Sequence, residues 1–188
     1  MSFTNRLFLT VFAAAAACSA ADPQPPTLSK VFDNQLRLAE REVVSLAEAM
    51  PADKYAFAPS DGEFKGVRTF ELQVKHLATT LYVVGAGSLG EKSPVEAGEN
   101  ENGAASIKGK EATVKYLKDA FAYAHKATQV LTPENATQMM DNGAGGKSSR
   151  IGMANVAIWH SFDHYGQMVV YARMNGIVPP ASQPQPSK

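Results

Sequence analysis

The sequence predicts an all-α protein, a four-helix bundle, and three observations support that fold class. Four segments repeat apolar residues at spacings of three and four, which is the pattern of a helix with one buried face. Clusters of proline and glycine separate these segments, and none of them alternates apolar with polar residues as a half-buried strand does. The length of 188 residues suits one domain with a single core.

The first helix is expected over residues 28–50. Thr27 or Ser29 can cap its N-terminus, because both carry a hydroxyl that accepts from a free helix N–H. Pro51 cannot continue the helix and ends it. Residues 22–27 contain three prolines, which fix the backbone and remove donors, so this segment is expected to be an extended linker.

The second helix is expected over residues 67–85, and its apolar stripe includes Phe70, Leu77 and Leu81. His76 lies on the flank of that stripe. Residues 86–107 are rich in glycine, glutamate and asparagine and are expected to form a long loop. A third helix follows over residues 109–131.

A short helix is expected from Pro133, because Thr132 can cap it and proline suits the first helical position. The glycine-rich residues 142–146 end it. The fourth long helix is expected over residues 149–175 and is apolar around most of its circumference, which predicts packing on several sides. The bundle domain then covers residues 28–182, and residues 183–188 are expected to be a disordered tail.

The first 21 residues have the layout of a secretory signal peptide. Arg6 precedes a short apolar run that leads into small residues, and cleavage is expected after Ala20 or Ala21. The protein is therefore expected to be exported to the periplasm. An alternative is a weak lipobox that ends at Cys18, whose lipidation would make the protein a membrane-anchored lipoprotein. Cys18 is the only cysteine, so the mature chain has no thiolate for a metal.

The charge balance argues against nucleic-acid binding, and the residues around two glycine motifs argue against nucleotide binding. The 18 basic and 18 acidic residues balance, so no nucleic-acid partner is expected. Gly85, Gly87 and Gly90 match a dinucleotide-binding pattern, which requires a helix that begins at the glycines, and Pro94 would lie in the first turns of that helix. Residues 145–148 resemble the end of a P-loop but lack its first glycine and its preceding strand.

The strongest functional signal is the pair His160 and His164 in the fourth predicted helix. Residues four apart lie about one turn apart, so both imidazoles leave the same side of the helix. Two neutral imidazoles in this arrangement form half of a transition-metal site. Histidines hydrogen-bonded to carboxylates or backbone in a polar bundle are the alternative.

A third ligand has to come from another helix. His76 is the natural candidate, because an antiparallel second helix could bring it opposite the pair. The carboxylates of Glu40, Glu71 and Asp163 are alternatives, although Asp163 is expected to face outward. His125 is read as a lone histidine at the edge of the core.

Several segments, in the right order, resemble the DinB-like superfamily, also called DinB/YfiT-like, a group of four-helix-bundle metalloenzymes. They are residues 50–55, 62–64 and 74–78, and the final segment with HxxxHYGQ followed by YARMNGIVPP. The resemblance covers most of residues 28–182. It implies a four-helix bundle with one divalent metal held by His76, His160 and His164.

Together with the expected signal peptide, this site predicts an exported metal-dependent enzyme of hydrolase or thiol-transferase type, acting on an unknown small-molecule substrate. Members of the family with known activity include thiol-dependent transferases and isomerases; low-molecular-weight thiols are mainly cytoplasmic, so the export signal, in which this chain departs from the better-known members, argues against thiol transfer. Zinc is the first choice of metal, with nickel and iron as alternatives. Gln167, one turn beyond His164, is the candidate for orienting a ligand or a water; the alternative is a polar residue that only packs between helices. The competing hypothesis is a non-catalytic, metal-stabilised binding or interaction module of the cell envelope. A homodimer stays open, since no residue argues for it.

Overall fold

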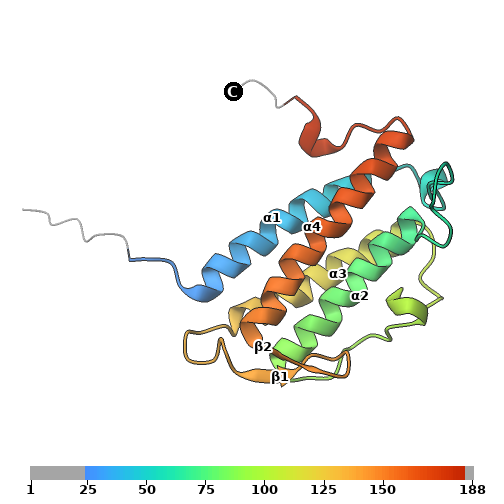
Figure 1. Ribbon diagram of the computed structural model, residues 1–188. Coiled ribbons are helices and arrows are strands. Elements are labelled where there is room, and N and C mark those ends of the chain that lie inside the picture. The colour runs from blue at the N-terminus through green and yellow to red at the C-terminus, as the bar shows by residue number, and fades with distance from the viewer. Residues whose placement is uncertain (1–23, 185–188) are drawn as a thin grey trace, which may run out of the picture.

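A computed structural model describes residues 24–184 and arranges the four long helices of this part as an up-down-down-up bundle (Figure 1). The helices are α1 (Leu28–Ala49), α2 (Phe70–Leu89), α3 (Lys110–Gln129) and α4 (Arg150–Met174). Both α1 and α2 pack against α3 and α4, so α1 and α2 occupy opposite corners. The predicted all-α four-helix bundle is confirmed.

Hydroxyl side chains begin three of these helices. Thr27 accepts from Lys30 N at the start of α1, and Thr69 and Ser149 cap α2 and α4 in the same way. α2 runs one turn beyond the predicted end and stops at Gly90, whose φ of 77° is the left-handed conformation that glycine adopts without strain.

The core lies along the bundle axis and is built from all four helices. Apolar side chains recur there at helical spacing, as the sequence predicted. The largest fully buried ones are Phe70, Phe121, Leu36, Leu46, Met50, Leu77, Leu81, Leu117, Met153, Met168, Val43 and Val74.

A long crossover, residues 90–109, sets the direction of the helices. It leads from the end of α2 back along the bundle to the start of α3 and includes a 3₁₀ turn, η2 (Glu99–Glu101) (Figure 1). As a result α2 and α3 run parallel, while α2 and α4 run antiparallel. The crossover therefore passes beside the middle of α2, where His76 lies.

A β-hairpin between α3 and α4 was not predicted. Its strands β1 (Met139–Asp141) and β2 (Lys147–Ser149) pair antiparallel, with Met140 opposite Ser148. Three residues are too few to show an alternating pattern, so the sequence signal was only the Asn142-Gly143 turn. The hairpin lies against the end of α2: a Cβ on Gly87 would come within 2.7 Å of the Asp141 carbonyl oxygen.

Two further expectations were wrong. Residues 133–137 form turns rather than a short helix. The reason is that the Asn135 side chain hydrogen-bonds the backbone of both Thr132 and Val130, which stabilises a turn at this point. α4 is not packed on several sides: Trp159 is 50% and Val170 54% exposed. The reason is that α4 occupies a corner and packs mainly on α1 and α2.

The remaining segments are short. The 3₁₀ turns η1 (Ala52–Lys54) and η3 (Pro180–Ser182) follow α1 and α4. Residues 24–27 and 183–184, from the expected linker and tail, lie in no helix or strand. The expected signal peptide, with Cys18, lies outside the described residues. Within residues 24–184, the helices lack the combination of length and apolar content that a membrane span requires.

Candidate metal centre

Three histidines meet between α2 and α4. His76 comes from α2 and faces His160 and His164, which lie one turn apart on α4. One ring nitrogen of each lies within 4.8 Å of the others, and the ring centroids of the α4 pair are 4.4 Å apart. Three histidines so placed could hold a metal ion. The three candidates from sequence are therefore brought together.

In two of the three rings, hydrogen bonds determine which nitrogen is free to bind a metal. His76 Nδ1 lies 3.1 Å from the Glu101 carbonyl oxygen, and His164 Nδ1 lies 2.5 Å from Gln73 Oε1. Both oxygens only accept, so each Nδ1 carries the proton and each Nε2 keeps its lone pair free. This is the arrangement in which second-shell acceptors orient metal-binding imidazoles.

His160 lacks such a partner. Its Nε2 is buried, and it has no hydrogen bond with any residue that the structure describes. A buried polar atom without a partner costs free energy, and a metal ion would supply that partner. The donor set therefore fits a borderline transition metal: three imidazoles, with a free nitrogen on each.

The cluster keeps its histidines neutral. Burial, followed by the neighbouring imidazoles, lowers the pKa of His160 to about 4 and that of His164 to about 3. Burial also lowers the pKa of His76. Metal ligation requires neutral imidazole, so the site is poised for a cation at neutral pH.

A glutamine relay supports His164. Gln73 Nε2 donates to Gln167 Oε1 at 2.9 Å, which leaves Gln73 Oε1 to accept from His164. Gln167 was predicted as the second-shell residue, but it acts one step further out, and Gln73 contacts the ring. The available signal for Gln73 was its position one turn before His76 on the same buried side of α2.

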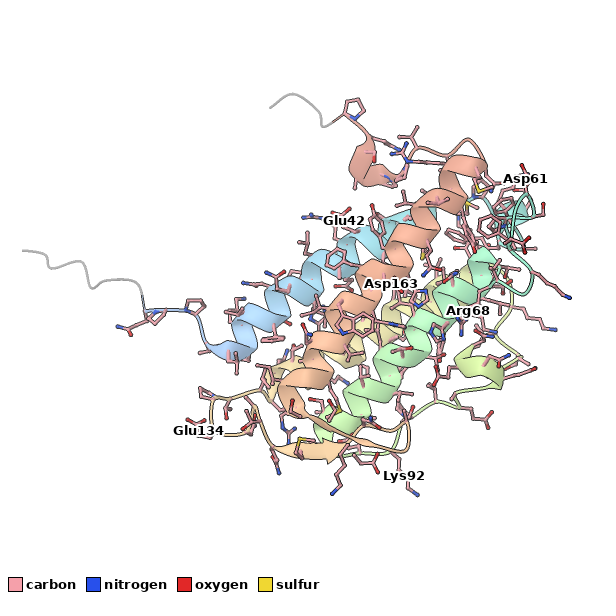
Figure 2. All side chains as sticks on the ribbon, viewed as in Figure 1. Glu42, Asp61, Arg68, Lys92, Glu134 and Asp163 are labelled. Atoms are coloured by element: carbon pink, nitrogen blue, oxygen red, sulfur yellow. The ribbon has the colours of Figure 1, made fainter. Side chains whose placement is uncertain are left out.

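A strained loop supports His76. Asn100 and Glu101 both have positive φ values, 52° and 59°, which non-glycine residues rarely adopt and which occur at functional sites. Arg68, just before α2 (Figure 2), holds this loop: its Nη2 donates to the Asn100 carbonyl at 2.9 Å and its Nε to Asn102 Oδ1 at 2.8 Å. The loop thereby directs the Glu101 carbonyl at His76.

The alternative ligands lie elsewhere. Glu40 Oε2 is 3.1 Å from Nε2 of His125, between α1 and α3. Glu71 accepts from Gly109 N and helps to start α3. Asp163 projects from the exposed side of α4, as expected (Figure 2). His125 is bound by carboxylates at the core edge, in agreement with its prediction as a residue outside the metal site.

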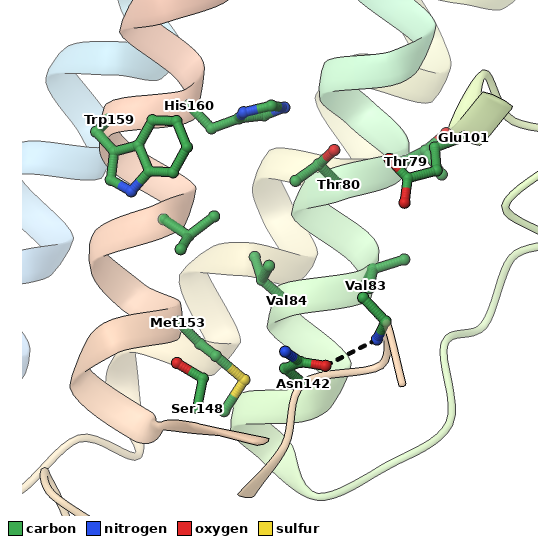
Figure 3. Close-up of a pocket in the computed structure, with 12 residues that line it drawn as sticks. Thr79, Thr80, Val83, Val84, Glu101, Asn142, Ser148, Met153, Trp159 and His160 are labelled. Carbon is green, nitrogen blue, oxygen red and sulfur yellow. Dashed lines mark hydrogen bonds between the residues drawn. The ribbon is translucent and has the colours of Figure 1, made fainter. Parts of the chain in front are cut away.

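A cavity of about 280 Å³ adjoins His160. α4 contributes Trp159 and His160 to its wall, and Thr80 and Val84 come from α2 (Figure 3). Asn142 from the hairpin closes the far end. The site thus combines three clustered imidazoles with a recess large enough for a small molecule.

The glycine-rich motifs have ordinary structural places. Gly85 and Gly87 lie in the last turns of α2 and Gly90 caps its C-terminus, the opposite of the helix start that a phosphate needs. Residues 145–148 span the end of the hairpin turn and the start of β2.

The chain is similar to known proteins in sequence and fold. The family model described as the DinB superfamily matches residues 35–168. A DinB-like protein from Bacillus cereus superposes with a TM-score of 0.62 at 17% identity, covering 79% of this chain and 93% of its own. A DinB-like protein from Bacillus subtilis gives 0.59 at 20% identity, covering 82% and 99%. No curated protein matches. At these sequence identities the two structures show a shared fold only.

Proposed function

The chain belongs to the DinB superfamily, and from this premise we propose that it binds one divalent transition metal through His76, His160 and His164. The observation that carries the proposal is the meeting of three free imidazole nitrogens within 4.8 Å. Zinc is the first choice, with nickel and iron as alternatives, because neutral imidazoles serve all three.

We further propose that the protein is a metal-dependent enzyme of hydrolase or thiol-transferase type. Three protein ligands leave a coordination position open, as in catalytic sites. A metal held there supplies Lewis acidity and activates a water or a thiol near neutral pH. The cavity beside His160 supports this proposal, because a small molecule bound there would lie next to one of the three histidines.

The competing proposal is a metal-stabilised bundle that binds or interacts without turnover. A fourth protein ligand would favour it. Among the described histidines, cysteines and acidic residues, the only group close enough to hold an ion is the three histidines. This supports the enzyme over the closed structural site.

Metal analysis tests the core of the proposal. Protein purified without a histidine tag should contain about one equivalent of metal, and His160→Ala should lose it. His125→Ala is the matched control, because it removes a histidine that lies outside the cluster. Wild-type metal content in His160→Ala would overturn the site. Turnover by the loaded protein in hydrolase and thiol-transfer assays separates the enzyme from the structural bundle.

Export to the periplasm, with or without lipidation at Cys18, is also a proposal. It rests on the pattern of residues 1–21. The intact mass of the protein recovered from its native cell distinguishes three forms: uncleaved, cleaved near Ala20, and cleaved and lipidated at Cys18. An uncleaved chain would contradict export by this signal.

A further inference from the structure

The cavity beside the three histidines has a chemical character that points to a class of ligand. Its walls are largely apolar, formed by Val83, Val84, Met153, Val156 and the indole of Trp159 (Figure 3). Of the residues that the structure describes, no lysine or arginine lines it, and Glu101 is its one carboxylate. Away from the three histidines, a charged group on a ligand would therefore lose its hydration without gaining a counter-charge from a side chain.

The polar groups of the wall are partly engaged within the protein. Thr80 Oγ1 donates to the His76 carbonyl, and Thr79 Oγ1 donates to the Lys75 carbonyl. Asn142 Oδ1 accepts from two hairpin amides, those of Ala144 and Gly146. These two bonds fix the orientation of the Asn142 amide and leave its NH₂ group, a donor, on the side of Val84 (Figure 3).

The two ends of the cavity therefore differ. One end holds His160, with its buried and unpartnered Nε2, and the other is closed by the hairpin. An engineered cavity of about 150 Å³ holds benzene, so a volume of about 280 Å³ accommodates roughly ten to fourteen non-hydrogen atoms. A bicyclic ring or a medium-length acyl chain has this size.

We propose that this cavity binds an uncharged, largely apolar small molecule, with a carbonyl or similar donor group directed at the three histidines. The apolar body would lie between α2 and α4 along Val84, Val156 and Trp159. The orientation of the polar end rests on the proposed metal site. The preference for an uncharged body rests on the cavity walls alone.

Trp159 makes the proposal measurable, because it is the only tryptophan in the chain and lines the cavity. Its indole N–H gives one resonance in a ¹H–¹⁵N spectrum. We would titrate metal-free protein, in which no bound cation compensates a carboxylate, with two probes of nearly equal size, the neutral ketone 2-acetylnaphthalene and the anion 2-naphthylacetate. The ketone should shift the resonance and bind at least about tenfold more tightly than the anion, because the cavity walls offer the anion no cationic side chain in exchange for its hydration.

Two variants narrow the cavity. Val156→Phe adds a ring inside it, and Ala144→Phe adds one from an exposed hairpin position outside the helical core. Each should weaken ketone binding by about tenfold or more. Val170→Phe is the matched control on the same helix, since Val170 is 54% exposed and lies outside the cavity, and it should bind as wild type does.

The outcomes separate this inference from the metal proposal. Tighter binding of the anion to metal-free protein, or unchanged ketone binding in both narrowing variants, would overturn the cavity assignment even if the protein takes up zinc normally. Selective ketone binding to a protein that takes up no metal would support the cavity and reject the metal centre. If the ketone binds more weakly after zinc is removed from wild type, its carbonyl is directed at the three histidines as proposed. Equal affinity with and without zinc would reject this orientation.

Discussion

Two polar clusters inside the bundle contain histidine, and they differ in the groups that surround the ring nitrogens. Between α1 and α3, His125 lies with Nδ1 2.6 Å from Asp33 Oδ1 and Nε2 3.1 Å from Glu40 Oε2. Between α2 and α4, the three histidines face one another. In the first cluster carboxylates bond the histidine, whereas the second offers three imidazoles that could hold a cation. Within this bundle, the histidines that could bind a metal are therefore those whose neighbours are other imidazoles.

The surroundings of the two clusters reinforce this contrast. Asp33 also pairs with Arg37 at 2.5 Å and accepts from Thr128. Burial raises the pKa of the Asp33 carboxyl, but the bonds from His125 and Arg37 outweigh burial and lower it. In the other cluster, the supporting groups are a glutamine and a backbone carbonyl, which orient imidazoles without changing their charge.

The largest difference between the clusters should appear in metal affinity. His76→Ala removes a ligand and should weaken zinc binding more than about 100-fold, since loss of second-shell support alone costs about 10–100-fold. His125→Ala should leave the affinity unchanged. Competition with a chromophoric chelator measures both. Equal affinities in the two variants would remove the basis of the comparison.

Loss of the support for one ligand should have a smaller effect. Gln73→Ala leaves His164 Nδ1 without its acceptor and should weaken zinc binding by about 10–100-fold. Gln167→Ala, which removes only the partner of Gln73, should weaken it less. The same chelator competition gives the order. A larger loss in Gln167→Ala than in Gln73→Ala would contradict the relay.

The carboxylate cluster should contribute to stability instead. His125→Ala leaves Asp33, 13% exposed at its side chain, without its main partner, which should lower the free energy of unfolding by about 1–2 kcal/mol. Chemical denaturation of the metal-free protein measures this change. In a double-mutant cycle, Asp33→Ala and His125→Ala should be less than additive; strict additivity would mean that the pair is not coupled.

The last contrast concerns the pH dependence of the stability of the metal-free protein. The folded-state pKa values of His160 and His164, about 4 and 3, lie below the unfolded value of about 6.5. Between these values the unfolded state binds more protons, so stability is full above pH 6.5 and falls as the pH drops toward 4. His160→Gln combined with His164→Gln should flatten this slope.

Asp33→Asn is the control for that measurement. The pKa of Asp33 is lowered from 3.8, so its contribution is lost only in more acidic solution than this window covers. The slope between pH 6.5 and 4 should therefore persist in Asp33→Asn. A flat profile in wild type would show that the three histidines are not kept neutral by the fold.

The sequence predicted the helices well, because their apolar residues recur every three or four positions and threonine or serine caps three of them. It also predicted that His160 and His164 lie together, since a spacing of four fixes two side chains on one face. His76 was the natural candidate for the opposite side, but carboxylates stayed open as alternatives until the family resemblance, because no local pattern says which helices become neighbours.

What the sequence could not predict is the support around the ligands. The Glu101 carbonyl lies near His76 because Arg68 holds the loop that carries it. Every residue has a backbone carbonyl, so the amino-acid sequence does not reveal which carbonyl contacts a histidine. The hairpin was missed because three-residue strands carry no periodicity. Gln73 was missed because a single amide in an apolar stripe does not reveal its partner.

The bond between His164 and Gln73 joins residues 91 positions apart, and His76 lies nearly as far in sequence from the pair on α4. A fragment of the chain must therefore extend from α2 to α4 to assemble the three imidazoles. Ligands this distant in sequence come together late, after most chain entropy has been lost. Zinc bound there would act after the folding barrier, so it should slow unfolding and leave the folding rate nearly unchanged. The ion would therefore stabilise the bundle after it has folded and would not help to nucleate folding.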